Sequence, residues 1–169
     1  RGKNWGIIGL GTIGHQVAYL AEAFGCNIAY SSTSGVNREE RYPRMELSEL
    51  LQWADVISVH SPLSAKTAGL IGKAEFEAMK PTAIIINVAR GGIVDEAALA
   101  EALNNNTIAG AALDVFSSEP LPSSPLYSLN DPDALLASPH TAWAADEAVK
   151  LLIKGVAENI KNFLLSLPQ

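Results

Sequence analysis

The sequence lacks several features that mark whole classes of protein. It has one cysteine in 169 residues, Cys26, so no disulfide can form within the chain. No apolar run approaches the roughly 20 residues that a helix needs to cross a bilayer. The opening residues also lack the charged, apolar and small-residue pattern of a signal peptide. From these absences we predict a cytoplasmic protein that does not associate with a membrane.

Clusters of basic residues are missing as well. The chain has 12 lysines and arginines against 18 acidic residues, a formal net charge of −6. Proteins that bind nucleic acid usually carry a basic patch or stripe, so nucleic acid is not an expected partner. Internal repeats and low-complexity segments are absent too, and we expect no metal site. What remains is the composition of an ordinary globular domain with one hydrophobic core.

Short apolar stretches rich in β-branched residues alternate with longer segments of helical period. This pattern is typical of a parallel sheet covered by helices on both faces. Residues 117–125 hold three prolines and four serines and are predicted as a loop. Strands are expected at 5–9, 27–31, 56–60, 83–88, 108–115 and 134–137, and helices at 13–24, 47–54, 73–80, 95–104 and 144–165. The pattern predicts an α/β doubly wound parallel sheet, the Rossmann fold.

A glycine-rich segment, GLGTIG at 9–14, follows the first expected strand and opens the first helix. Gly9 permits a tight turn, Gly11 lets the backbone approach a pyrophosphate, and Gly14 allows the helix to pack closely on the strand. The N–H groups of Thr12 and Ile13 then lie at the positive end of the helix. The alternative is a glycine-rich turn without a ligand, but the surrounding strand–helix–strand order favours a dinucleotide.

The second strand does not end in the acidic residue that usually binds the adenosine ribose of NAD. Ser31 and Ser32 stand there instead, and their hydroxyls could bond the ribose without repelling a 2′-phosphate. Arg38 or Arg41 could then accommodate NADP, although both belong to a mixed-charge segment typical of a solvated surface. Because no arginine directly follows Ser31, we expect NAD to be preferred by a small margin, with NADP still possible.

Further motifs follow this glycine segment in a fixed order. They are HSPL at 60–63 with Thr67 beyond it, NVARGG at 87–92, ALDVF at 112–116 leading to Glu119, and SPHTAW at 138–143. With them the whole chain resembles the D-isomer-specific 2-hydroxyacid dehydrogenases. Trp143 is similar to the residue common in the glycerate dehydrogenase or hydroxypyruvate reductase branch.

Three residues of these motifs have side chains suited to reducing a 2-keto acid. Arg90 follows a buried strand, and its planar fork of donors fits a substrate carboxylate. His140 can exchange a proton with the substrate oxygen near neutral pH, and Glu119 can orient that imidazole. Each could instead be an ordinary surface, loop or capping residue, but together they are better explained by one site. The resemblance assigns these three residues the same catalytic roles.

The resemblance also implies which residues contact the cofactor. Asp114 would hold the nicotinamide carboxamide, Val88 and Ala89 would line the nicotinamide ribose, and His60 with Pro62 would cover the adenosine side. The remaining contacts expected from the motifs are Thr67, Arg90, His140 and Ala142. His15 has no acidic partner in an obvious position and is expected to be structural or exposed.

Members of this family have two domains, and the segment preceding the glycine motif forms most of the substrate domain. The chain is therefore expected to be the cofactor domain, 1–145, followed by a helix at 146–169 that would return to a substrate domain largely absent here. Such a chain should fold and bind cofactor but show negligible turnover alone. The full-length protein would be a homodimer acting on a small D-2-hydroxy or 2-keto acid. The alternatives are a nicotinamide-sensing module like the corepressors related to this family and, less favoured, a formate or phosphite enzyme.

Overall fold

The computed structural model describes residues 1–35, 41–120 and 123–166. The chain divides into two compact units, Arg1–Pro139 and His140–Gln169, which are described separately below.

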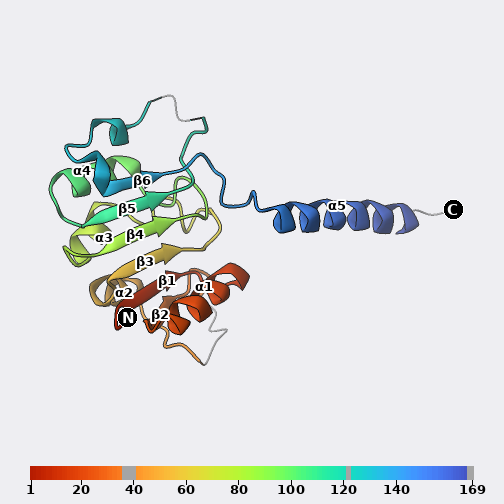
Figure 1. Ribbon diagram of the computed structural model, residues 1–169, viewed down its shortest axis with the longest axis horizontal. Coiled ribbons are helices and arrows are strands. Elements are labelled where there is room, and N and C mark those ends of the chain that lie inside the picture. The colour runs from red at the N-terminus through yellow and green to blue at the C-terminus, as the bar shows by residue number, and fades with distance from the viewer. Residues whose placement is uncertain (36–40, 121–122, 167–169) are drawn as a thin grey trace. The chain divides into compact units, whose positions relative to one another are not determined.

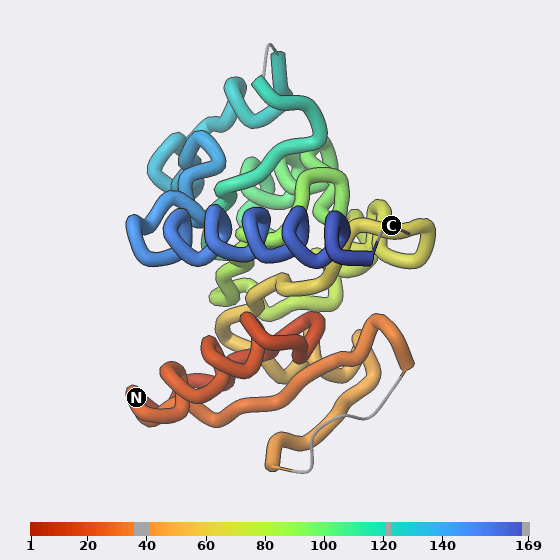
Figure 2. The backbone as a smooth tube through the Cα atoms, turned by 90° about the vertical axis from the view of Figure 1, so that its right-hand side faces the viewer, coloured from red at the N-terminus to blue at the C-terminus, as the bar shows by residue number. Residues whose placement is uncertain are grey.

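The first unit is built on one sheet of six parallel strands in the order β2-β1-β3-β4-β5-β6 (Figure 1). All five neighbouring pairs are parallel. The strands are β1 (Asn4–Ile8), β2 (Asn27–Ser31), β3 (Val56–Val59), β4 (Ile84–Asn87), β5 (Gly110–Leu113) and β6 (Leu135–Ala137). This arrangement confirms the predicted doubly wound fold. The strands point to the right in Figure 1, so Figure 2, seen from that side, looks onto their carboxyl ends.

Every predicted strand and helix of this unit is present, with small differences at the ends. The largest concerns β5, which was expected over 108–115 and spans Gly110–Leu113. Its partner β4 offers four residues, and their register pairs Ile84 with Gly110 and Asn87 with Leu113. The flanking apolar residues Ile108 and Val115 are buried outside the ladder, so hydrophobicity alone overstated the strand.

Helices cover the two faces of the sheet unequally. The helices are α1 (Thr12–Ala23), α2 (Leu47–Trp53), α3 (Lys73–Ala78) and α4 (Glu96–Asn104). The larger core lies on the face of α2, α3 and α4, whereas a smaller core packs α1 against β1 and β2. Ile8 belongs to the larger core and Ile7 to the smaller one, as the alternation of side chains along a strand requires. Asp95 caps α4, accepting hydrogen bonds from the N–H groups of Ala97 at 2.9 Å and Ala98 at 3.0 Å.

Two short 3-10 helices that the pattern did not indicate lie between the predicted loop at 117–125 and β6. They are η1 (Pro125–Ser128), which begins at the last residue of that loop, and η2 (Pro132–Ala134). Each has proline at its start, where a missing N–H costs nothing.

The second unit consists of a short lead segment and one helix, α5 (Asp146–Ser166). None of the helix residues is buried, and a series of large apolar side chains along it is exposed. Within the part of the chain that the structure describes, no helix is both long and apolar enough to cross a membrane.

Candidate functional site

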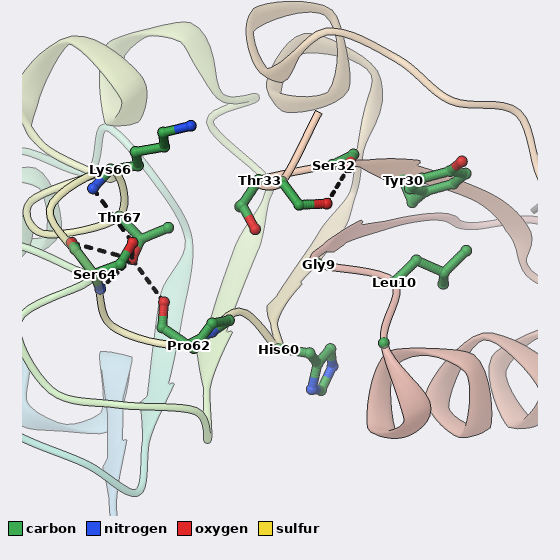
Figure 3. A pocket seen from close by; sticks show the side chains of 12 residues that line it. Gly9, Leu10, Tyr30, Ser32, Thr33, His60, Pro62, Ser64, Lys66 and Thr67 are labelled. Atoms are coloured by element: carbon green, nitrogen blue, oxygen red, sulfur yellow. Dashed lines mark hydrogen bonds between the residues drawn. The ribbon is translucent and has the colours of Figure 1, made fainter. Parts of the chain in front are cut away.

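A cavity of about 460 Å³ opens at the carboxyl ends of the first three strands (Figure 3). Because β2 and β3 lie on opposite sides of β1, the strand order reverses there, and doubly wound sheets bind their ligands at such a switch point. The lining residues come from the loops after all three strands: Gly9, Leu10, Gly11, Tyr30, Ser32, Thr33, Ser34, His60, Pro62, Ser64, Lys66 and Thr67.

The three glycines of the GLGTIG segment differ in what surrounds them. Gly9 has a φ of +92°, and an added Cβ would lie 2.9 Å from the backbone nitrogen of Ser61. At Gly14 an added Cβ would lie 2.5 Å from the carbonyl oxygen of Gly9, so only glycine lets α1 begin this close to β1. At Gly11, by contrast, no protein atom lies within 4 Å of the added Cβ. The backbone at Gly11 therefore faces open space at the mouth of the cavity.

The N-terminus of α1 offers unused hydrogen-bond donors. Gly11 is the N-cap and provides no side-chain cap, and no acidic residue occupies the first turn. Thr12 and Ile13 are exposed at the start of the helix, where the first N–H groups have no intrahelical acceptor. A phosphate placed here would meet these donors and the positive end of the helix dipole.

The end of β2 differs in detail from the expectation. Ser32 lines the cavity, and its Oγ lies 3.3 Å from that of Ser34. Ser31, expected at the same ribose, is only 9% exposed and is not among the lining residues. Its carbonyl oxygen instead accepts a hydrogen bond from the N–H of Gly9 at 3.0 Å. Tyr30 and Thr33 line the cavity without having been singled out from the sequence.

Of the two arginines considered for a 2′-phosphate, the structure describes Arg41, which is not among the residues that line the cavity. Arg38 lies outside the described residues. Arg41 forms an ion pair with Glu22, and its guanidinium lies 5.4 Å from the centre of the Tyr42 ring. Arg41 is thus engaged on the surface beside α1.

Thr67 holds the loop after β3 in place. Its hydroxyl donates a 2.6 Å hydrogen bond to the carbonyl oxygen of Pro62 and accepts one from the N–H of Ser64 at 2.8 Å. The side chain is 2% exposed, although it borders the cavity. Because the hydroxyl proton is already used, we assign Thr67 to shaping the loop rather than to donating a hydrogen bond to a cofactor.

His60 sits at the base of this loop and lines the cavity (Figure 3). Burial lowers the pKa of its imidazole, because the charged form loses hydration. Among the described residues, its Nε2 and the Oγ of Ser61 are buried without a hydrogen-bond partner. Such atoms normally cost about 1–3 kcal/mol, so a polar ligand group reaching Nε2 would relieve that cost.

Asn87 fixes the turn that carries Arg90 and was not selected as a site residue from the sequence. Its Nδ2 donates to the carbonyl oxygen of Arg90 at 2.9 Å, and its Oδ1 accepts from the N–H of Ala89 at 3.0 Å. The side chain is 1% exposed, whereas Arg90 and Val88 are exposed at the carboxyl edge of the sheet. The sequence signal that could have identified Asn87 is an amide residue at the last position of an otherwise apolar strand.

Gly91 brings the Arg90 turn against the loop that carries Glu119. A Cβ added at Gly91 would overlap the carbonyl group of Phe116 and lie 2.6 Å from the backbone nitrogen of Ser117. In that loop, the Oε1 of Glu119 accepts a hydrogen bond from the N–H of Phe116 at 2.9 Å. Glycine at position 91 is therefore required for Arg90 and Glu119 to belong to adjoining backbone segments.

A backbone ladder joins the loop after β3 to the segment after β4. The N–H of Gly69 donates to the carbonyl oxygen of Gly92 at 2.8 Å, and the N–H of Ile71 donates to that of Ile93 at 3.1 Å. Ile71 also pairs with Val94 in an isolated parallel bridge. Hydrogen bonds between main-chain atoms thus join the two segments.

Asp114, expected near the nicotinamide, ends up buried after β5. It is 4% exposed and accepts a 2.6 Å hydrogen bond from the hydroxyl of Ser138. This contact anchors the segment that leads to His140.

His140 and Ala142 belong to the second unit, so their positions relative to Arg90 and Glu119 stay predictions. His140 has a φ of +54°, and Asn106 is the other non-glycine residue of the described ranges with a positive value. Backbone strain of this kind is concentrated at functional positions.

The cavity fits a dinucleotide in three independent respects: a switch-point location, glycines that a side chain would obstruct, and an uncapped helix N-terminus. A metal would need a different set of groups. In the described part of the chain, no cluster of three or more histidine, cysteine or acidic side chains could hold one.

Comparison with known proteins agrees with this geometry. A family model described as D-isomer specific 2-hydroxyacid dehydrogenase, NAD binding domain, matches residues 1–142. Glyoxylate reductase of Aeropyrum pernix is 42% identical over 167 residues, covering 96% of this chain and 49% of that protein. Glycerate dehydrogenase of Methylorubrum extorquens is 37% identical over 171 residues, covering 99% of this chain and 52% of that protein.

A solved structure gives the same result in three dimensions. The NADPH-dependent glyoxylate/hydroxypyruvate reductase of Sinorhizobium meliloti, in complex with NADP and malonate, has a TM-score of 0.90 at 35% identity. The match covers 98% of this chain and 51% of that one. The chain thus spans about half the length of the relatives that it matches. On the family model and these likenesses, the chain belongs to the D-isomer specific 2-hydroxyacid dehydrogenases and forms their NAD-binding domain.

Proposed function

We propose that this chain is the cofactor-binding part of an enzyme that interconverts a small D-2-hydroxy acid and its 2-keto acid, of the glycerate and hydroxypyruvate type. The observation that carries the proposal is the shared carboxyl edge of one sheet, which holds both the glycine-bounded cavity and the Arg90 turn. The relatives named above as glyoxylate reductase and glycerate dehydrogenase support this substrate class. Action in the cytoplasm, as a homodimer, remains a prediction.

Arg90 is proposed to anchor the carboxylate of the acid. A guanidinium offers two parallel N–H donors to a carboxylate, which fixes orientation as well as supplying charge. Its Nη1 currently donates to the carbonyl oxygen of Ala89 at 2.7 Å, and Asn87 holds the surrounding turn. The backbone that carries the guanidinium is therefore held in place at the edge of the sheet.

His140 is proposed to move the proton and Glu119 to support it. When bound, a nicotinamide cofactor supplies or accepts the hydride at C2 of the acid. The imidazole of His140 gives a proton to the C2 oxygen during reduction and removes it during oxidation. Glu119, with Oε1 fixed by the N–H of Phe116, would orient the imidazole. This division of labour needs a closed, water-poor cleft, to which a substrate domain would contribute.

The corepressor alternative receives no support from the relatives named here, which carry the names of enzymes. The set Arg90, Glu119 and His140 has no evident use in a module that only senses nicotinamide dinucleotide, so the enzyme remains the favoured function.

Replacing Gly11 by valine should weaken NADH binding by about 10- to 100-fold. That loss corresponds to about 1.4–2.8 kcal/mol, the contribution of about one hydrogen bond to a charged group. The new side chain fills the open space in front of the α1 N-terminus, where no protein atom lies within 4 Å of the Cβ. The fold should therefore survive while pyrophosphate is kept away. Fluorescence titration with NADH measures the dissociation constant.

Gly155→Val provides the matched control, because a Cβ at Gly155 on α5 also meets nothing within 4 Å. It should leave NADH affinity unchanged. Unaltered affinity in a folded Gly11→Val protein would contradict the assignment of the cavity. A panel of hydroxypyruvate, glyoxylate and pyruvate with the complete enzyme then tests the reaction, and no turnover with any of them would refute the proposed substrate class.

A further inference from the structure

The walls of the cavity have an unusual chemical balance. Six of the lining residues carry hydroxyl groups, and none of the lining residues in the described part of the chain is acidic: the hydroxyls come from Tyr30, Ser32, Thr33, Ser34, Ser64 and Thr67. One lining residue is a lysine, Lys66. A site of this kind has no carboxylate to hold the two ribose hydroxyls of NAD and nothing to repel an additional phosphate.

Lys66 reaches the cavity from the loop after β3, opposite the end of β2 (Figure 3). Its backbone position is well defined, because its N–H lies 3.3 Å from the Oγ of Ser64. The neighbouring Thr67 also fixes the loop through its hydrogen bond to the carbonyl oxygen of Pro62. Thr33 and Ser32 lie on the facing wall. A group held between the two walls would meet an ammonium on one side and hydroxyls on the other.

The ammonium of Lys66 is available to a ligand. Within the described ranges it forms no ion pair or hydrogen bond, whereas Lys73 pairs with Glu101 at 2.6 Å and Lys80 with Asp55 at 3.0 Å. His60 does not add a second positive charge, because burial lowers its pKa and favours the neutral imidazole near pH 7. Among the described residues that line the cavity, Lys66 therefore supplies the positive charge.

We propose that Lys66, with the hydroxyls of Ser32, Thr33 and Ser34, binds the 2′-phosphate of NADP(H), so that this chain favours NADPH over NADH. The inference rests on the proposed function only in taking the cavity as the cofactor site. It reverses the preference expected from the sequence, which considered only arginines close to Ser31. A 2′-phosphate carries about −1.5 to −2 charges and three strong acceptor oxygens, the groups that an ammonium and several hydroxyls bind.

The test compares four ligands that differ in this one group: NADPH with NADH, and adenosine 2′,5′-bisphosphate with 5′-AMP. Calorimetric titration of the wild-type chain should give tighter binding of each 2′-phosphorylated member. Lys66→Gln should weaken both of these by about tenfold, the effect of losing about 1.4 kcal/mol of charge-assisted bonding. The same variant should change NADH and 5′-AMP by less than about twofold. Lys66→Arg should keep the preference, since it keeps the charge.

Lys73→Gln is the matched control, because it removes the same charge from an exposed side chain of the same unit that does not line the cavity. It should leave all four affinities unchanged. Tighter binding of NADH than NADPH by the wild type, or an equal effect of Lys66→Gln on both dinucleotides, would overturn this inference alone. Failure of the wild type to bind either dinucleotide would overturn the proposed function as well.

Discussion

Replacing His140 by alanine should lower turnover of the complete enzyme by about 10²–10⁴-fold, the usual contribution of a general acid–base group. Dinucleotide affinity should change little, because the cavity is lined by residues from the ends of β1, β2 and β3. The measurement is kcat for keto-acid reduction under saturating cofactor, with a separate titration of the dinucleotide. A selective loss of kcat is the expected signature of a residue that moves the proton.

A second variant separates proton transfer from backbone strain. His140 has a φ of +54°, which asparagine tolerates better than alanine. His140→Asn should thus retain the local backbone but remain as inactive as His140→Ala, since an amide cannot exchange the proton. Recovery of activity in His140→Asn would assign the residue a conformational role, and near-normal turnover in both variants would show that the acid–base group lies elsewhere.

Gly91→Ala should cost the complete enzyme about 100-fold in turnover without contacting the substrate. Its Cβ would overlap the carbonyl group of Phe116, so either the Arg90 turn or the Glu119 loop must move. A displacement of about 1 Å in positioning groups can lower the rate by about 10². Steady-state kinetics should show both a higher KM for the acid and a lower kcat, because anchoring and proton transfer are disturbed together.

Gly72→Ala is the corresponding control. Gly72 has an extended φ of −117°, and its added Cβ would lie 3.5 Å from Oε2 of Glu75, an ordinary contact distance. This variant should keep wild-type kinetics. If Gly91→Ala folds and also keeps them, then the close approach of the two loops is not needed to hold Arg90 and Glu119.

Features that depend on local periodicity could be predicted from the sequence. The strands, the helices, the tight turn at Gly9 and the close packing at Gly14 follow from alternation, helical period and the need for close backbone approach, which are properties of adjacent residues. Asp95 illustrates this, since its N-cap bonds reach only two and three residues along the chain. The parallel order of the sheet also follows, because helices must connect neighbouring strands.

Features that depend on which loops meet could not be read in the same way. Ser31 and Ser32 are adjacent, but the alternation at the end of β2 buries one and brings the other to the cavity. Lys66 follows β3, and β2 and β3 are both neighbours of β1 in the sheet. The loops after these two strands therefore border the same cavity at the end of β1. Thr67 was expected to contact the cofactor, yet its hydroxyl is used within its own loop. Each outcome is set by tertiary packing that composition and spacing do not specify.

The main-chain ladder between Gly69 and Gly92 has a thermodynamic consequence. It joins the loop that borders the cavity to the turn that carries Arg90, so ordering of either segment reduces the entropy still to be lost by the other. Cofactor and acid should therefore bind with positive cooperativity. Linkage then requires two factors to be equal, whichever ligand is added first. The dinucleotide must raise the affinity for the acid by the same factor as the acid raises the affinity for the dinucleotide.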